Sequence, residues 1–171
     1  MTPELAKSMA EFFISVIEME TGTTRKIIAA VPEDKSSYRP HDDSRTALEI
    51  ARHIPLTDMW FLDAVTNGEF AMPDPSAEQA VTSVAGALRI YDEDFGPALE
   101  KVKALSGEVL AKDVSMMGAF NMSAVIYLSF LIRHTVHHRG QLSAYLRPMG
   151  AKVPSIYSGS ADEPFEMPSG E

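Results

Sequence analysis

Three of the five histidines of this chain lie in the segment HTVHH, at positions 134, 137 and 138. Residues four apart stack on one face of a helix, so His134 and His138 can reach a common point. His137 is rotated by about 60° from His134 and about 100° from His138, at the edge of that face. Two neutral imidazoles directed at one point are typical ligands of Zn²⁺ or Ni²⁺. The spacing fits equally well two core histidines that hydrogen-bond to carbonyls or carboxylates.

A metal held by this pair needs a further ligand from another helix, and His53 is the candidate. It lies in the long and largely apolar segment TALEIARHIPLTDMWFLDAV. A lone histidine in such a segment is usually a hydrogen-bonded core residue, so the assignment depends on the need of the pair for a partner. Pro55 removes a helical hydrogen bond and predicts a kink close to His53, which leaves the buried face of this segment undefined. His41 precedes the segment in a polar loop, and we expect it in solvent or at the mouth of a cavity.

Four other polar residues are assigned from their direction on these segments. Gln141 shares the face of the histidine pair and is expected to contact one of the ligands. His137 is expected at the rim of the site or in an interface, without coordinating the metal. Arg139 points away from the pair and is expected at the surface or in an interface. Asp58 is the only acidic residue of its segment with an inward direction.

Four long segments with helical periodicity must position these residues, at about 3–31, 45–67, 77–105 and 121–147. Thr2, Asp43–Ser44 and Ser76 are the expected N-caps of the first three segments. The apolar face of the first segment is formed by Leu5, Met9, Phe12, Phe13, Val16 and Ile17. Residues 107–120 are expected to connect the last two segments, with a short extended piece at most. Four such helices in one domain predict an all-α four-helix bundle.

The composition fits one globular domain over residues 1–171 and excludes several classes of function. The 15 Lys and Arg against 24 Asp and Glu give a net charge of −9 without a basic cluster, so no nucleic acid is expected as a partner. The absence of cysteine excludes a disulfide framework, a thiolate zinc site and a cysteine nucleophile. No signal-peptide pattern and no membrane-length apolar run is visible, so we expect a cytoplasmic protein that binds no membrane.

The phrase HTVHHRGQLSAYLRPMG, followed by VPSIY, resembles the closing helix and tail of the DinB/YfiT-like family of bacterial metal-binding four-helix bundles. The phrase SYRPHDDSRTALEIARHI is similar to the entry into the second helix of that family. By helix order the resemblance covers nearly the whole chain. It implies that His53, His134 and His138 form a metal triad that binds zinc or nickel, with water in the open position. Pro55 departs from the family pattern.

Three functions are compatible with such a site. The family includes thiol transferases and a thiol-dependent isomerase, so the resemblance implies a metal-dependent S-transferase that uses a low-molecular-weight bacterial thiol in stress response or detoxification. The first alternative is a hydrolase that uses a metal-bound hydroxide, which normally requires a carboxylate base nearby. The second is a non-catalytic metal-binding bundle. Thiol transfer is favoured because it needs no protein base.

Two further expectations concern assembly and the chain end. The 10 Met and 8 Phe are a large apolar inventory for four helices, and together with the resemblance they predict a homodimer. The segment from about residue 151 is rich in Pro, Ser and Gly, so it is expected to be irregular. Part of this tail is expected to pack as a strap, and its extreme end to be loose.

Overall fold

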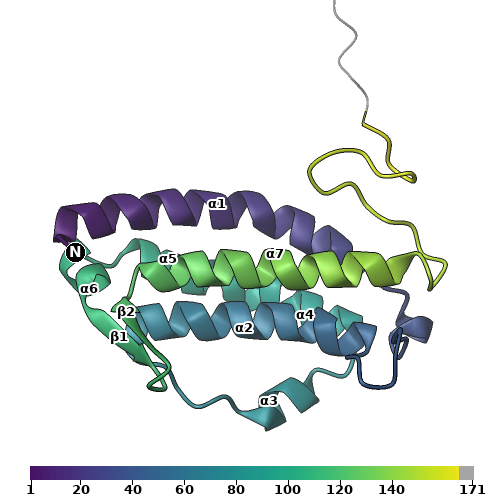
Figure 1. Ribbon diagram of the computed structural model, residues 1–171, viewed down its shortest axis with the longest axis horizontal. Coiled ribbons are helices and arrows are strands. Elements are labelled where there is room, and N and C mark those ends of the chain that lie inside the picture. Colours follow the sequence, from purple (N-terminus) through teal and green to yellow (C-terminus); the bar gives the residue numbers. More distant parts are fainter. Residues whose placement is uncertain (166–171) are drawn as a thin grey trace, which may run out of the picture.

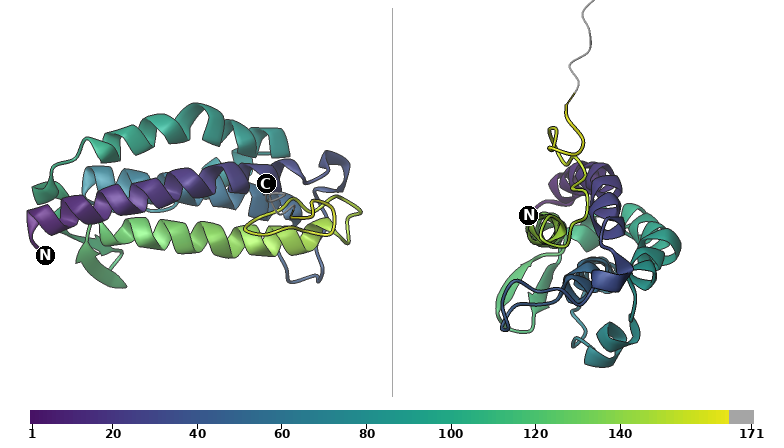
Figure 2. Two further views of the ribbon diagram at one scale, coloured as in Figure 1. Left: turned by 90° about the horizontal axis from the view of Figure 1, so that it is seen from above. Right: turned by 90° about the vertical axis from the view of Figure 1, so that its right-hand side faces the viewer.

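The computed structural model describes residues 1–165, in which the predicted all-α fold is confirmed (Figure 1). The helices are α1 (Pro3–Ala29), α2 (Ala47–Asn67), α3 (Pro75–Ala80), α4 (Val84–Arg89), α5 (Gly96–Lys103), α6 (Gly107–Ala111) and α7 (Ile126–Leu146). A 3₁₀ turn, η1 (Glu33–Lys35), follows α1, and a π-helical turn, η2 (Ile90–Phe95), joins α4 to α5. Viewed end-on, α1, α2, α7 and the continuous α4–η2–α5 unit surround one core (Figure 2, right).

Helix α1 begins where the sequence predicts, but its buried face differs from the prediction. Oγ1 of Thr2 accepts a hydrogen bond from the backbone N–H of Leu5 at 3.3 Å, which caps the helix. The predicted apolar face is wrong in part, because Leu5 and Phe12 are 53% and 63% exposed. The face that packs in the bundle carries smaller side chains and includes Ala6, Ala10, Ile14 and Ile17.

Helix α2, which carries His53, begins later than predicted. Thr46 caps it in place of Asp43–Ser44: the Thr46 side chain accepts from the N–H of Glu49, whose carboxylate accepts from the N–H of Thr46. This reciprocal capping box satisfies two backbone donors. The helix runs unbroken through Pro55, which is buried, and ends at Gly68, whose φ of 76° suits a residue without Cβ.

The single third helix predicted over residues 77–105 is wrong. Asp74, not Ser76, caps α3, and its Oδ1 accepts from the N–H of Ser76 at 2.8 Å. The chain then leaves helical geometry at Val81, and Ser83 caps the separate helix α4 by accepting from the N–H of Gly86 at 3.0 Å. The capping side chains thus offer the backbone an alternative to a continuous helix.

A small hairpin replaces the predicted start of the last helix. Strand β1 (Asp113–Met116) pairs antiparallel with β2 (Phe120–Ser123), and the turn between them holds Gly118 at φ 79°. Helix α7 therefore begins at Ile126 and not near residue 121. The hydroxyl of Tyr127 donates to the carbonyl of Val114 at 2.8 Å, which ties the hairpin to the first turn of α7.

The segment from Ala151 to Phe165 contains no helix or strand, as expected. Arg147 pairs with Asp162 at 2.7 Å, and the same carboxylate accepts from the N–H of Val153 at 2.9 Å, so this part is held as a strap. The expectation of a loose end concerns residues 166–171, which lie outside the described residues. None of the helices in residues 1–165 is both long and apolar enough to cross a membrane.

Candidate metal centre

His53 of α2 and His134 and His138 of α7 come together between the two helices. One nitrogen atom from each ring lies within 4.8 Å of the others, and all three side chains are half-buried. The Nε2 atoms of His53 and His134 are 3.0 Å apart. The ring centroids are separated by 4.4 to 4.8 Å. The structure therefore brings together the three histidines that the sequence singled out.

Two of the three histidines are hydrogen-bonded through the ring nitrogen Nδ1. Nδ1 of His138 lies 2.7 Å from Oε1 of Gln141, which confirms the predicted contact of this glutamine. Nδ1 of His53 lies 3.3 Å from Oγ1 of Thr57. Sequence reasoning missed this threonine, although its position one helical turn after His53 was a usable signal. Hydrogen bonds at Nδ1 fix the orientation of both rings, and Nε2 of His53 faces His134 at the centre.

His134 is held differently from the other two histidines. Its Nδ1 is buried and has no hydrogen-bond partner within residues 1–165. The ring instead packs edge-on against His53, His138 and Phe61, with a centroid separation of 6.3 Å to the last. Packing rather than hydrogen bonding therefore sets its orientation.

The surroundings keep these imidazoles neutral. Burial, followed by the nearby charges of Arg45 and His138, lowers the pKa of His53 to about 4. Burial, followed by the neighbouring histidines and Arg45, lowers the pKa of His134 to about 3. Burial also lowers the pKa of His138, although its hydrogen bond to Gln141 opposes the shift. Neutral imidazole is the form that binds a metal.

The cluster fits a divalent metal ion. Ligand nitrogens at about 2.1 Å from a tetrahedral zinc are separated by about 3.4 Å. The Nε2 atoms of His53 and His134 are 3.0 Å apart, and a nitrogen of His138 lies within 4.8 Å of both ligand atoms. Without a metal, two Nε2 atoms 3.0 Å apart must share one proton. Three protein ligands leave a coordination position open, which is the arrangement typical of catalytic rather than structural zinc. The cluster could therefore hold one metal ion with room for a small molecule.

A cavity of about 590 Å³ opens beside the three histidines, within the range of small-molecule sites. Its wall is mainly apolar and includes Leu56, Met59, Trp60, Phe61, Met72 and Met116. Three carboxylates also line it: Asp63, Asp74 and Glu78. The indole N–H of Trp60 donates to the carbonyl of Ala71 at 2.8 Å, which fixes the chain after α2 against this wall.

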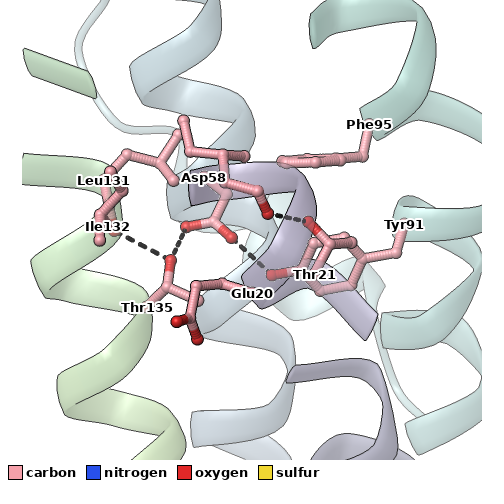
Figure 3. Close-up of a pocket in the computed structure, with 9 residues that line it drawn as sticks. Glu20, Thr21, Asp58, Tyr91, Phe95, Leu131, Ile132 and Thr135 are labelled. Atoms are coloured by element: carbon pink, nitrogen blue, oxygen red, sulfur yellow. Dashed lines mark hydrogen bonds between the residues drawn. The ribbon is translucent and has the colours of Figure 1, made fainter. Parts of the chain in front are cut away.

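Asp58 points inward as predicted but belongs to a different cluster (Figure 3). The hydroxyl of Tyr91 lies 2.5 Å from its Oδ2, and the hydroxyl of Thr135 lies 2.6 Å from its Oδ1. Thr135 also contacts the carbonyl of Leu131 at 2.9 Å. The single hydroxyl hydrogen of Thr135 can serve only one of these two acceptors at a time. Burial raises the pKa of Asp58 to about 7, although the hydrogen bonds from Thr135 and Tyr91 oppose the shift.

The prediction for Arg139 is wrong: its side chain is only 1% exposed. Its guanidinium donates to the Glu20 carboxylate of α1 at 2.5 Å and to Oγ1 of Thr24 at 3.2 Å, and it also contacts the hydroxyl of Tyr157 in the tail. The error arose because α7 packs against α1 as well as α2, so the face turned away from the histidines is also buried.

The remaining two histidines lie outside the cluster. His41 is exposed in the loop before α2 and lies 3.5 Å from Asp43, in agreement with the expectation of a solvent position. His137 is exposed, and its ring centroid is 4.8 Å from that of His138. Neither contributes a nitrogen to the group of three.

The fold and the site together define the class of protein: a helical bundle in which three histidines from two helices converge and could hold a metal ion. The model of the DinB family matches residues 7–166. The chain belongs to the DinB family.

Two relatives and two solved structures show the extent of this likeness. The uncharacterized Bacillus subtilis protein YjoA is 26% identical over 129 residues, 74% of this chain and 82% of YjoA. The uncharacterized protein YrdA of the same species is 24% identical over 155 residues, 90% of each chain. A DinB-like protein of Bacillus cereus superposes with a TM-score of 0.72 at 23% identity, over 86% of this chain and 97% of that chain. The crystal structure of YjoA gives 0.67 at 20% identity, over 84% and 96%. The structural likeness shows the shared fold.

Proposed function

We propose that this protein is a metal-dependent enzyme that transfers a low-molecular-weight thiol to an electrophilic small molecule. His53, His134 and His138 would hold one Zn²⁺ or Ni²⁺. The observation that carries the proposal is the convergence of three neutral imidazoles at one end of a largely apolar cavity of about 590 Å³. A divalent metal supplies Lewis acidity there, which makes a bound thiol or water far more acidic. Such an enzyme would serve stress defence or detoxification in the cytoplasm.

Thiol transfer suits the residues around the site better than hydrolysis does. In the transfer, the thiol loses its proton to solvent water, its sulfur forms a bond to the electrophilic carbon, and the bond from that carbon to the leaving group breaks, so that the leaving group departs with the electron pair. This step needs no carboxylate from the protein. Hydrolysis normally needs a general base within hydrogen-bond reach of the attacking water. Asp58, the only inward carboxylate expected in α2, lines a different cavity and is bonded to Tyr91 and Thr135. The carboxylates of Asp63, Asp74 and Glu78 line the cavity of about 590 Å³, but within residues 1–165 none of them is hydrogen-bonded to the three histidines.

The proposal is tested by metal analysis and by an assay on the same protein samples. We expect about one zinc or nickel per chain, and conjugation of monochlorobimane that depends on an added bacterial thiol. His53→Ala, His134→Ala and His138→Ala should each lose most of the metal together with the activity. His41→Ala, which alters an exposed histidine outside the cluster, is the matched control and should retain both.

The two alternatives give different results in this experiment. Hydrolysis of a p-nitrophenyl ester without thiol, abolished by the same three variants, would identify a hydrolase. Stoichiometric metal without either activity would identify a non-catalytic metal-binding bundle. Full metal content and full activity in His53→Ala would contradict the assignment of the three ligands.

We also infer that the protein acts as a homodimer. Leu5, Phe12 and Met19 are exposed and lie at seven-residue intervals on α1, so they form an apolar stripe on its outer side. Light scattering at tens of micromolar should give twice the chain mass, and Phe12→Glu should shift it toward the monomer. A wild-type monomer at this concentration would contradict the inference.

A further inference from the structure

All three histidines line the first cavity, and two of them also line a second one. His53 and His138 line both the cavity of about 590 Å³ and a second cavity of about 300 Å³. The second cavity is completed by Ser44, Arg45, Ile50, Gln141 and Tyr145. We call the first the apolar chamber and the second the Arg45 chamber. The centre therefore lies at the junction of two chambers, each large enough for part of a small molecule.

The two chambers carry opposite charge. Every ionised side chain in the wall of the apolar chamber is a carboxylate, from Asp63, Asp74 and Glu78. In the Arg45 chamber, the guanidinium of Arg45 is the one permanently charged group. A small anion would therefore be repelled on one side of the histidines and attracted on the other.

Arg45 has no competing partner for its charge. Within residues 1–165 it forms no salt bridge. Glu49 lies within electrostatic range, but one of its carboxylate oxygens already accepts from the N–H of Thr46 at 2.6 Å. The hydroxyl of Tyr145 donates to the backbone carbonyl of Arg45 at 3.2 Å, which anchors this residue to α7 beside the histidines. Its backbone is fixed in this way while its exposed guanidinium stays unpaired within residues 1–165, and such a group can bind a carboxylate through two parallel hydrogen bonds.

We propose that the two chambers hold the two substrates separately. The Arg45 chamber takes a carboxylate-bearing thiol, whose carboxylate pairs with Arg45 while its sulfur reaches the histidines. The apolar chamber takes an electrophile with an apolar body and no negative charge. This assignment rests on the thiol transfer proposed above. The new carbon–sulfur bond then forms at the junction, and the proton and leaving group depart as described for that step.

The Arg45 chamber is tested with cobalt-loaded protein and two thiol probes. Mercaptosuccinate carries carboxylates, whereas thioglycerol is uncharged, and binding of each is followed by the change in the visible cobalt spectrum. Arg45→Gln should weaken mercaptosuccinate binding by about tenfold and change thioglycerol binding by less than about twofold. Arg39→Gln is the matched control, because Arg39 lies in the same loop, pairs with Asp42 and lines neither chamber.

The outcomes separate this assignment from the proposed function. A normal cobalt spectrum with equal weakening of the two thiols, or with no weakening, would overturn the assignment of Arg45 alone. A protein that gives no cobalt spectrum would overturn the metal centre, and the assignment would fall with it. Weakening of mercaptosuccinate binding by Arg39→Gln to the same degree would show a general charge effect and would also overturn it.

The apolar chamber has its own reporter, because Trp60 is the only tryptophan of the chain. Energy transfer from Trp60 to dansylamide, an uncharged apolar probe, needs no metal. We expect dansylamide to bind at least about fivefold more tightly than the anionic dansylglycine, and Met72→Glu to weaken it while Arg45→Gln does not. Met72 is 77% exposed, so this substitution leaves the core intact. Equal binding of the two probes, or loss of dansylamide binding in Arg45→Gln, would overturn the assignment of this chamber.

Discussion

Helices α2 and α7 hold two polar clusters in adjacent turns, and the two differ in how fully their polar atoms are bonded. His134 and Thr135 are neighbours in α7, yet His134 belongs to the histidine cluster and Thr135 to the cluster of Asp58 and Tyr91. In the histidine cluster, Nε2 atoms face one another at 3.0 Å, and cavities open on two sides. In the Asp58 cluster, both carboxylate oxygens have hydrogen-bond partners and the side chain is 1% exposed.

This difference in hydrogen bonding indicates that the Asp58 cluster stabilises the fold, whereas the histidine cluster has the capacity to bind a ligand. Buried polar groups stabilise a protein only when their hydrogen bonds are made, and the Asp58 cluster meets this condition. The histidine cluster has ring nitrogens directed at one point without enough protons to satisfy them, and Nδ1 of His134 has no partner in the described chain. Such a cluster gains from a cation, whereas the Asp58 cluster would not.

The largest expected effect is stabilisation by metal that depends on one cluster and not on the other. Zinc at about a thousandfold its Kd should raise the free energy of unfolding of the wild type by about 4 kcal/mol. His134→Ala should abolish this increase, because the centre loses a ligand. Asp58→Asn should lower the stability of the apo-protein but keep the full increase. Thermal unfolding with and without zinc measures both effects. An equal loss of zinc stabilisation in Asp58→Asn would show that the two clusters act as one site.

The next effect is the pH dependence that Asp58 gives to stability in metal-free protein. In the fold its pKa rises to about 7 from an ordinary 3.8, because the side chain is buried. The contribution of the protonated form is complete below 3.8 and is lost as the pH rises through about 7. Relative to Asp58→Asn, the wild type should lose about 3 kcal/mol between pH 5 and pH 8. Urea unfolding measures this, with Asp63→Asn as an exposed control on the same helix.

The histidine cluster should make the stability of the metal-free protein depend on pH in the opposite direction, and by a smaller amount. The pKa of His134 falls to about 3 in the fold because of burial, so its contribution is present above the ordinary 6.5 and is lost as the pH drops below that value. Relative to His134→Gln, metal-free wild type should lose about 1 kcal/mol between pH 7 and pH 5, after allowance for partial solvent exposure. His41→Gln is the exposed control. A slope of the same sign as that of Asp58 would refute the neutral state of the histidine cluster.

The sequence identified local features of these clusters better than contacts between elements. His134 and His138 follow from one helical turn, and Gln141 from the turn after it, so their arrangement was predictable. His53 was predicted only because the pair needed a partner. Thr135 and Tyr91 were missed, since their contacts with Asp58 join three elements that are distant in sequence.

In the fold, too, local features were predicted better than contacts between elements. Which side chains are buried on the outer faces of the helices depends on packing that the sequence does not reveal. The cap predicted at Thr2 and the helix end predicted at residue 67 depend on neighbouring residues alone, and both are present. The breaks in the third helix and the burial of Arg139 depend on which elements lie beside each other. A charged side chain is usually exposed, and Arg139 departs from this rule because Glu20 and Tyr157 neutralise and bond it in place.

The smallest expected effect is that of replacing His137, which should leave the metal content unchanged. This substitution tests whether His134 and His138 are the metal ligands in α7. His137 is adjacent to His138 in sequence, but its side chain is exposed and none of its nitrogens belongs to the group of three. A metal between α2 and α7 can be reached by side chains one helical turn apart, whereas the neighbouring position is rotated by about 100° away from His138. His137→Ala should therefore keep about one metal per chain by elemental analysis and the same zinc stabilisation as the wild type. A stoichiometric loss of metal in this variant, with metal retained in His134→Ala, would exchange His134 for His137 as the ligand and move the centre toward solvent.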